Sequence, residues 1–143
     1  MIRKYNPEDV NEVIDVWRNA SLIAHPFLSK EFMEQEANTM RYFDLKEAEV
    51  FVYESGEGIA GFVAMVENDV GALFIDPAKQ RKGIGKALLD YIIQSRNYLT
   101  VDVFKENVIG LPFYIKYGFE IVNEFPHKDT GDMVYRMKYI PGS

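Results

Sequence analysis

The 143-residue sequence predicts a single α/β domain, with a mixed, mostly antiparallel central sheet of about six to seven strands flanked by about four helices. Helical and strand patterns follow one another in the order β-α-α-β-β-β-α-β-α-β-β. Hydrophobic residues make up 48% of the chain and charged residues 27%, as in ordinary globular proteins. Because no repeat or linker divides the chain, we expect one domain over residues 1–143, with helices on both faces of the sheet.

The first third of the chain predicts one strand and two helices. Residues 2–5 form a short strand candidate, and Asn-Pro at 6–7 is typical of a helix cap followed by proline at the first helical position. Apolar residues then recur at three- and four-residue spacing over 10–21, which is one helical face. Pro26 ends this helix, and Ser29 is the expected cap of the next one.

The remaining elements are mostly strands. Residues 49–54 and 59–67 predict a hairpin, and residues 70–76 a third strand. An amphipathic helix is expected from Lys86 onward. Further on, the patterns predict a strand over 98–104, a short helical segment between 107 and 117, and strands over 119–125 and 132–140.

Charge and composition exclude several classes of protein. A net charge of −6 argues against a general nucleic-acid binder, which usually carries a basic face. No apolar run approaches the ~20 residues of a membrane span, and no secretory signal is visible. The absence of cysteine excludes disulfides, thiolate metal sites and cysteine-linked intermediates. We therefore expect a cytoplasmic protein without a metal, a nucleic-acid partner or a membrane partner.

The stretch "QRKGIG", residues 80–85, places two glycines where the helix should begin. A helix N-terminus binds anions, and glycine lets the backbone approach a ligand closely. A phosphate cradle and a flexible basic turn fit this hexapeptide equally well. A Walker loop is excluded by the spacing, and a dinucleotide fingerprint by leucine where its third glycine should stand.

Two motifs together resemble the GCN5-related N-acetyltransferase (GNAT) family. "QRKGIG" is similar to the family's Gln/Arg-x-x-Gly-x-Gly/Ala signature, and Asn107 with "PFYIKYGFEIV" resembles its second block, an Asn followed by Phe-Tyr-x-x-x-Gly-Phe. The element order fits the family from end to end. Near the N-terminus, "VWRNASLIAHPFLS" resembles a bacterial subgroup with a Trp-x-x-Ser and His-x-Phe pattern, some of whose members are regarded as protein lysine acetyltransferases.

The resemblance implies acetyl-CoA as co-substrate. Tyr114 matches the family's general acid, although a core tyrosine is the alternative, and a backbone N–H around Phe74 or Ile75 matches its oxyanion donor. Asn107 matches a contact to the pantetheine arm, with a helix cap as the alternative. The residues that the resemblance assigns to the cofactor are Leu73, Phe74, Ile75, Gln80, Arg81, Lys82, Gly83, Ile84, Gly85, Lys86, Asn107, Tyr114 and Tyr117.

The general base is open. Glu67 and Asp69 lie near the turn into the strand before the glycine loop, and His25 has the pKa range that a base needs. His127 is expected to be an exposed loop residue. Gly110 and Pro112 interrupt the run from Asn107 to Tyr114, so we expect that helix to be irregular in its first turn or to start near Pro112.

Two functions follow from these expectations. The first is an N-acetyltransferase that moves an acetyl group from acetyl-CoA directly to a primary amine in a ternary complex, since no cysteine can form an acyl-enzyme. Its acceptor would be a protein lysine, a protein N-terminus or a small amine. The alternative is a non-catalytic acyl-CoA-binding sensor. The sequence is compatible with a monomer or a homodimer.

Overall fold

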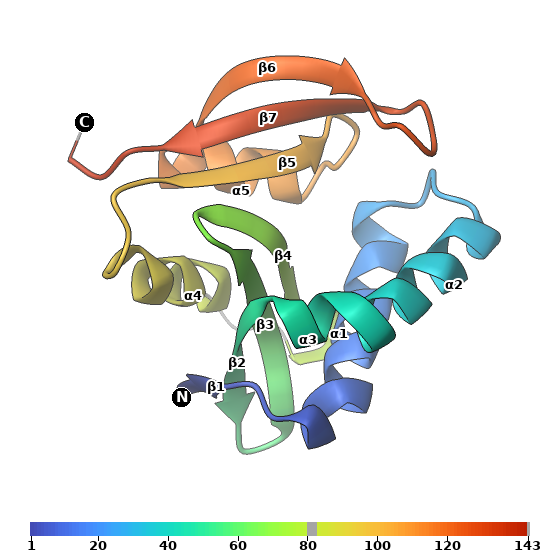
Figure 1. Ribbon diagram of the computed structural model, residues 1–143, viewed down its shortest axis with the longest axis vertical. Helices are drawn as coiled ribbons and strands as arrows, with labels where there is room; N and C mark the ends of the chain where they lie inside the picture. Colours follow the sequence, from blue (N-terminus) through green and yellow to red (C-terminus); the bar gives the residue numbers. More distant parts are fainter. Residues whose placement is uncertain (80–82, 143) are drawn as a thin grey trace.

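The alternating apolar runs form one seven-stranded sheet in the order β1-β2-β3-β4-β5-β7-β6 (Figure 1). The structure is a computed structural model that describes residues 1–79 and 83–142. Neighbouring strands are antiparallel except β4 and β5, which are parallel. The strands are β1 (Ile2–Lys4), β2 (Glu49–Ser55), β3 (Gly58–Val66), β4 (Asp69–Ile75), β5 (Leu99–Phe104), β6 (Glu120–Pro126) and β7 (Met133–Tyr139).

The helices follow the predicted order, so the expected fold class is confirmed. They are α1 (Val10–Ala24), α2 (Lys30–Thr39), the short α3 (Leu45–Glu47), α4 (Ile84–Ile93) and α5 (Gly110–Tyr117). Single 3₁₀ turns cover Pro7–Asp9 and Pro77–Lys79, and a π-helical segment, Met40–Asp44, joins α2 to α3. The Ser29 side chain caps α2 by accepting a hydrogen bond from the Phe32 N–H at 3.1 Å, as predicted.

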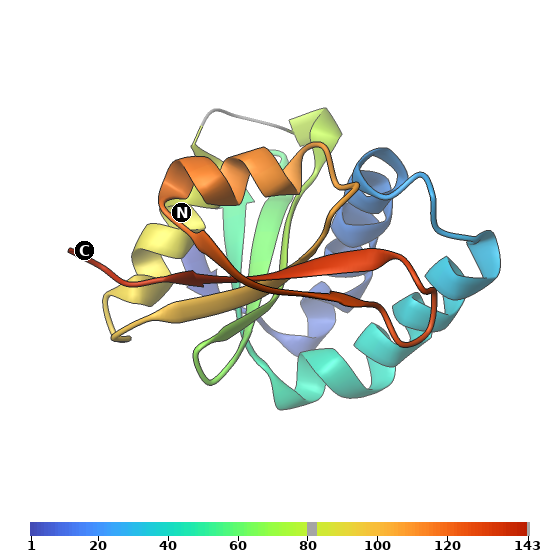
Figure 2. The ribbon, with the colours of Figure 1, turned by 90° about the horizontal axis from the view of Figure 1, so that it is seen from above.

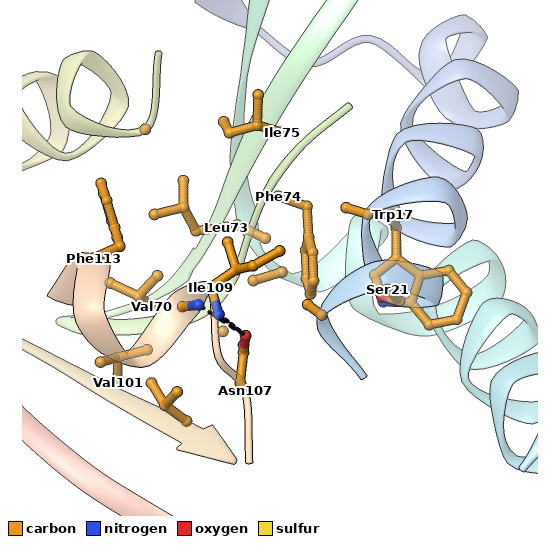
Figure 3. A pocket seen from close by; sticks show the side chains of 18 of the residues that line it. Trp17, Ser21, Val70, Leu73, Phe74, Ile75, Val101, Asn107, Ile109 and Phe113 are labelled. Atoms are coloured by element: carbon orange, nitrogen blue, oxygen red, sulfur yellow. Dashed lines mark hydrogen bonds between the residues drawn. The ribbon is translucent and has the colours of Figure 1, made fainter. Parts of the chain in front are cut away.

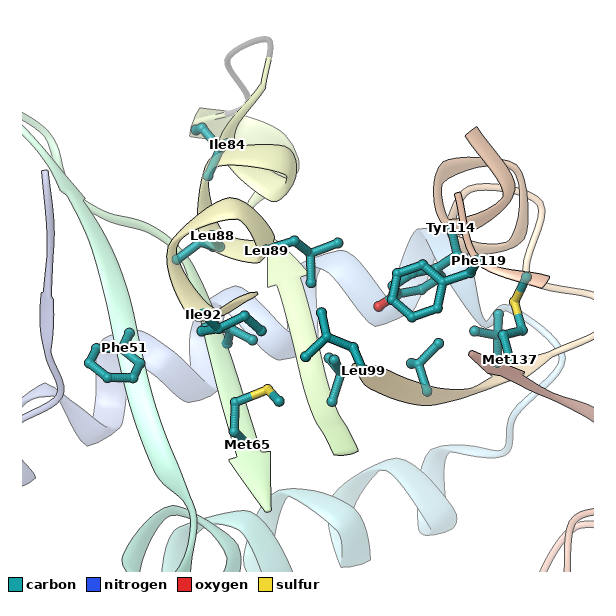
Figure 4. Close-up of a cluster of buried hydrophobic side chains, with 14 of the residues drawn as sticks. Phe51, Met65, Ile84, Leu88, Leu89, Ile92, Leu99, Tyr114, Phe119 and Met137 are labelled. Atoms are coloured by element: carbon teal, nitrogen blue, oxygen red, sulfur yellow. The ribbon is translucent and has the colours of Figure 1, made fainter. Parts of the chain in front are cut away.

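Two hydrophobic cores form, one on each face of the sheet, because side chains of a strand alternate between its faces. Helices α1 and α2 cover one face, where Trp17 and Phe62 pack together with Met33. Helices α4 and α5 cover the other (Figure 2), where Leu88, Leu89 and other buried residues form the cluster of Figure 4. Alternation therefore sends neighbouring residues of β4 into different cores.

Strands β4 and β5 diverge soon after they begin. Only Asp69↔Thr100 and Val70↔Val101 are paired between them, whereas β4 stays paired with β3 as far as Ile75 (Figure 1). The Thr100 hydroxyl donates to Asp69 Oδ1 at 2.7 Å where the strands meet. The remainder of β4 consequently has a free backbone edge on the side of β5.

The direction of each amide on that free edge follows from one hydrogen bond. The Asp76 N–H donates to the Ala60 carbonyl of β3 at 2.8 Å. Because alternate residues of an antiparallel strand point to the same neighbour, the Phe74 N–H also points to β3. The N–H groups of Leu73 and Ile75 point the other way, into the gap between β4 and β5.

Candidate active site

A cavity of about 1330 Å³ occupies the gap where β4 and β5 diverge. Its walls come from α1, α2, β4, α4, β5 and α5, so elements distant in sequence meet around it. In Figure 3 the Phe74 ring stands between Leu73 and Phe113 on one side and Trp17 and Ser21 on the other. The cavity thus extends across the sheet, from the α4–α5 side to the α1–α2 side.

The first turn of α4 closes one end of the cavity. Gly83 is the N-cap residue, with a left-handed φ of 89°, and no side chain caps the helix among the described residues. The first intrahelical bond runs from the Ala87 N–H to the Gly83 carbonyl at 2.8 Å, so the N–H groups before Ala87 have no partner within the helix. This end suits an anion. Gln80, Arg81 and Lys82, which were assigned to the same role, lie outside the described residues.

The other predicted residues of this turn have distinct environments. The Ile84 side chain is only 2% exposed and belongs to the core, so only its backbone can reach a ligand. A Cβ at Gly85 would lie 3.0 Å from Phe113 Cζ, so close packing of α5 also favours glycine there. Lys86 Nζ pairs with Asp90 Oδ2 at 2.8 Å.

The two predicted tyrosines of α5 differ in their contacts. Tyr114 is 6% exposed, packs edge-on against Phe119 in the core cluster, and also lines the cavity (Figure 4). Burial, reinforced by the charge of Asp69, raises its pKa above the ordinary value. The Tyr117 hydroxyl instead donates to Asp90 Oδ1 at 2.8 Å, which ties α5 to α4. Burial and this bond raise the pKa of Tyr117.

Asn107 caps α5 and contacts His25. Its Oδ1 accepts from the N–H groups of Ile109 (3.1 Å) and Gly110 (2.8 Å), and its Nδ2 lies 3.2 Å from His25 Nε2. The helix begins at Gly110, so the prediction of a start near Pro112 is confirmed, and Pro112 stands in the first turn, where no intrahelical donor is lost.

His25 lies in the connection after α1, and its ring lines the cavity. The rings of Phe27, Phe74 and Phe104 surround it, with centroids 5.2–6.2 Å away. Burial among them lowers the pKa of His25 to about 4. At neutral pH the imidazole is therefore uncharged, and one of its nitrogens is engaged by Asn107.

The two carboxylates considered as bases do not line the cavity. Glu67 is exposed in the β3–β4 turn with φ 57°, and its carbonyl accepts from Arg96 Nε at 2.9 Å. Asp69 lies where β4 meets β5, bonded to Thr100, and burial raises its pKa. The structure thus separates Glu67 from the cavity and places Asp69 outside it, where β4 and β5 are still paired.

Sequence reasoning missed several groups on the α2 side of the cavity. His127 is half-buried, lines the cavity and packs against Phe104 and Phe32, so the prediction of an exposed loop residue was wrong. Glu36 and Asp44 line it as well. The signal for Glu36 was available, because it is a carboxylate in the otherwise apolar helical stripe of Met33, Ala37 and Met40.

Ser21 is the other residue that was missed. It lies on the cavity side of α1, one helical turn after Trp17 and one turn before His25. Its side chain is fully buried, and its Oγ has no hydrogen-bond partner among the residues that the structure describes. Position 20, where the Trp-x-x-Ser pattern of the subgroup would place the serine, holds alanine, so Ser21 stands one place later.

Residues 1–79 and 83–142 contain neither a membrane-spanning helix nor a cluster of metal ligands. None of the helices in these ranges is long and apolar enough to cross a membrane. The same ranges contain no group of three or more His, Asp or Glu side chains that could hold a metal ion.

Comparisons with known proteins identify the family. Residues 46–121 match the model of the acetyltransferase (GNAT) domain. The peptidyl-lysine N-acetyltransferase YiaC of Escherichia coli K12 is 30% identical over 124 residues, which cover 86% of this chain and 85% of that protein. YjaB of the same species, also named a peptidyl-lysine N-acetyltransferase, is 29% identical over 91% of this chain and 88% of that protein.

Solved structures agree with these sequence matches. The solution structure of apo YjaB from Escherichia coli superposes with a TM-score of 0.86 at 26% identity, covering 97% of this chain and 96% of that one. PaiA N-acetyltransferase from Thermoplasma acidophilum, solved with coenzyme A, shares the fold with a TM-score of 0.76 at 21% identity, over 98% of both chains. The chain therefore belongs to the GNAT acetyltransferase family, and the enzyme class predicted from the sequence, an acetyl-CoA-dependent N-acetyltransferase, is confirmed.

Proposed function

We propose that the cavity between β4 and β5 binds acetyl-CoA and that the protein transfers the acetyl group directly to a primary amine, with a peptidyl lysine as the preferred acceptor. The observation that carries this proposal is the free edge of β4, where the N–H groups of Leu73 and Ile75 point into the cavity. An extended chain of amide groups, such as the pantetheine arm, can bind there as an added strand.

The residues around the cavity fit the remaining parts of coenzyme A. The uncapped N–H groups at the start of α4 suit a pyrophosphate, and Gly83 supplies the left-handed backbone that this turn requires. Lys116 lines the same cavity and adds positive charge, whereas the charge of Lys86 is paired with Asp90. Asn107 uses its Oδ1 in the cap of α5 and one N–H towards His25, so its proposed role is to hold α5 and the pantetheine end of the cavity in place.

Bound acetyl-CoA would supply an activated acyl group. For its transfer, we assign the Ile75 N–H as the donor to the acyl oxygen, where negative charge develops in the transition state. The phenol of Tyr114, kept protonated by burial, is the proton donor for the leaving sulfur. Because the chain has no cysteine, the amine itself attacks the carbonyl carbon within a ternary complex, after the bound ammonium has lost one proton to water. The C–N bond forms as the C–S bond breaks, and the proton that the nitrogen loses on acylation replaces the one that Tyr114 gives to the sulfur.

Support for a peptidyl-lysine acceptor comes from the relatives named peptidyl-lysine N-acetyltransferases. The test measures release of free thiol from acetyl-CoA in the presence of lysine peptides, peptides with a free N-terminus and small amines. We expect acceptor-dependent release that is fastest with lysine peptides. Tight coenzyme A binding without release for any amine would instead identify a non-catalytic sensor, and release with small amines alone would refute the peptidyl acceptor.

A further inference from the structure

The cavity contains carboxylates of two kinds. Some are neutralised, since Asp90 pairs with Lys86 at 2.8 Å and Asp102 pairs with Arg136 at 2.9 Å. Glu36, Asp44 and Glu47, at the α2–α3 end of the cavity, form no ion pair with any residue in the described part of the chain. This end therefore carries three carboxylates without an ion pair, opposite the end where α4 begins, and only the more distant charge of Lys128 and the imidazole of His127 offset that of Glu36 among the described residues.

Glu36 is the most enclosed of these three carboxylates. It is half-buried, whereas Asp44 and Glu47 are exposed. Burial raises its pKa, and the nearby charges of Asp44 and Asp129 raise it further, while His127 and Lys128 act in the opposite direction. For this carboxylate the loss of hydration outweighs what the nearby His127 and Lys128 return, so the free protein holds it at a cost.

A second, independent observation lies on the α1 wall. The Ser21 side chain is 0% exposed and lines the same cavity (Figure 3), and its Oγ has no hydrogen-bond partner within residues 1–79 and 83–142. A serine within a helix usually satisfies its hydroxyl by bonding back to the preceding turn. A buried hydroxyl left unpaired costs about 1–3 kcal/mol. A polar ligand bound in the cavity would supply the hydrogen-bond partner that this hydroxyl lacks.

We propose that Glu36 and Ser21 form the subsite for the acceptor's primary ammonium: the carboxylate of Glu36 receives the charged group, and the Ser21 hydroxyl accepts one of its N–H bonds deeper in the cavity. This inference rests on the proposed function and names its acceptor as a cationic lysine side chain. An ammonium carries three donors and no acceptor, which suits a carboxylate and a hydroxyl oxygen.

The surroundings also match the rest of a lysine side chain. Its aliphatic stem needs apolar walls while its charged head needs polar partners. Leu28, Phe32 and Met33 line this part of the cavity beside Glu36. A neutral amine would form only a weaker, uncharged hydrogen bond with the carboxylate, and an anionic acceptor would be repelled by it, so the subsite favours acceptors that bind as cations.

The experiment measures binding, independently of turnover. A lysine peptide and the same peptide with norleucine in place of lysine are titrated into coenzyme A-loaded protein by calorimetry. We expect E36Q to weaken lysine-peptide binding about tenfold or more, as befits a lost charged hydrogen bond, and to leave norleucine-peptide binding unchanged. E31Q is the matched control on the exposed side of α2 and should bind both peptides as the wild type does.

Other outcomes overturn the proposal. Equal lysine-peptide affinity for E36Q and E31Q would remove Glu36 from acceptor binding, as would equal affinity of the wild type for lysine and norleucine peptides. Thermal unfolding of each variant checks that it folds, and E36D provides a second test, in which charge is kept and reach shortened. Loss of binding in E36Q with partial recovery in E36D supports the subsite.

Failure of this inference is distinguishable from failure of the proposed function. If acetyl transfer occurs but E36Q has the same KM for the lysine peptide as E31Q, only the subsite is wrong. If no amine releases thiol but the preference for lysine over norleucine persists and depends on Glu36, the subsite stands and the transferase proposal fails. S21A adds a further readout, because it should weaken lysine-peptide binding without changing coenzyme A affinity.

Discussion

Asn107 Nδ2 lies 3.2 Å from His25 Nε2, and the hydrogen bonds of the Asn107 oxygen show that the amide nitrogen is the atom facing the imidazole. Because Oδ1 accepts two backbone N–H bonds in the cap of α5, Nδ2 must be the atom that faces His25. An amide NH₂ only donates, so Nε2 accepts and the imidazole proton resides on Nδ1. The contact joins the α1–α2 connection to α5 and fixes one tautomer of His25.

Asn107→Asp tests this contact. Aspartate keeps the cap of α5 but replaces the donor that faces His25 with a carboxylate, which stabilises the charged imidazolium. We expect the pKa of His25 to rise from about 4 in the wild type. An NMR pH titration of the imidazole C–H signals measures it, and His127→Gln assigns the two histidines. An unchanged titration of His25 would show that the two side chains are not in contact.

The lowered pKa of His25 also predicts a pH dependence of stability. Its ordinary value is 6.5 and its value in the fold is about 4, so between these pH values the unfolded chain binds a proton that the folded chain does not. The contribution of His25 to the free energy of unfolding is therefore fully present above pH 6.5 and is lost as the pH falls towards 4. From pH 7 to pH 5 the free energy of unfolding falls by about 2 kcal/mol on account of His25.

Urea unfolding of the wild type and of His25→Gln at both pH values isolates this contribution. Glu36 and Asp69 have raised pKa values, so they act in the opposite direction in both proteins and cancel in the comparison. We expect the wild type to lose more stability than the variant on going to pH 5. Equal losses would mean that His25 is solvated rather than buried.

Tyr114→Phe tests the proton donor. We expect turnover to fall about 100-fold, the lower limit typical of general acid catalysis, because a thiolate leaves fairly well unaided. Coenzyme A affinity should change less than twofold. Tyr117→Phe is the control on the same helix: it removes the bond to Asp90 and should cost stability of about 1 kcal/mol. Unchanged turnover in Tyr114→Phe would exclude this hydroxyl as the acid.

Gly83→Ala tests the turn at the start of α4. With φ at 89°, alanine is strained there by about 1–2 kcal/mol, and a shift of the turn would misplace the N–H groups proposed to hold the pyrophosphate. We expect lower stability together with weaker coenzyme A binding, measured by denaturation and calorimetry. Gly56→Ala, at a position with open space and no positive φ, should change neither. Full coenzyme A affinity in Gly83→Ala would separate this turn from the ligand.

Ser21→Ala should stabilise the free protein. Removing a buried hydroxyl without a partner is expected to raise the free energy of unfolding by about 1 kcal/mol, and alanine is also the better helix former. Ser29→Ala provides a contrast, because it removes the cap of α2 and should cost about 1 kcal/mol. Urea denaturation in the absence of peptide measures both. A destabilised Ser21→Ala would mean that the hydroxyl has a partner after all.

Local patterns were sufficient for the element order and for the two family motifs. Some features depend on only a few neighbouring residues, so they can be predicted from the sequence and agree with the structure: the alternation of the strands, the Ser29 cap and the interruption at Pro112. The same holds for Gly83, whose left-handed φ arises within one turn, whereas Gly85 also answers to the packing of Phe113 from α5.

The acceptor side of the cavity was not predictable in this way. Glu36, His127 and Ser21 come from α2, the β6–β7 connection and α1, and they line one cavity because β4 and β5 diverge and the helices pack over the opening. Glu67 is close to β4 in sequence, but it lies outside the cavity because it stands in the β3–β4 turn, before the point where β4 and β5 diverge. Spacing along the chain reports which face of an element a residue occupies, whereas packing between elements determines which faces share a cavity.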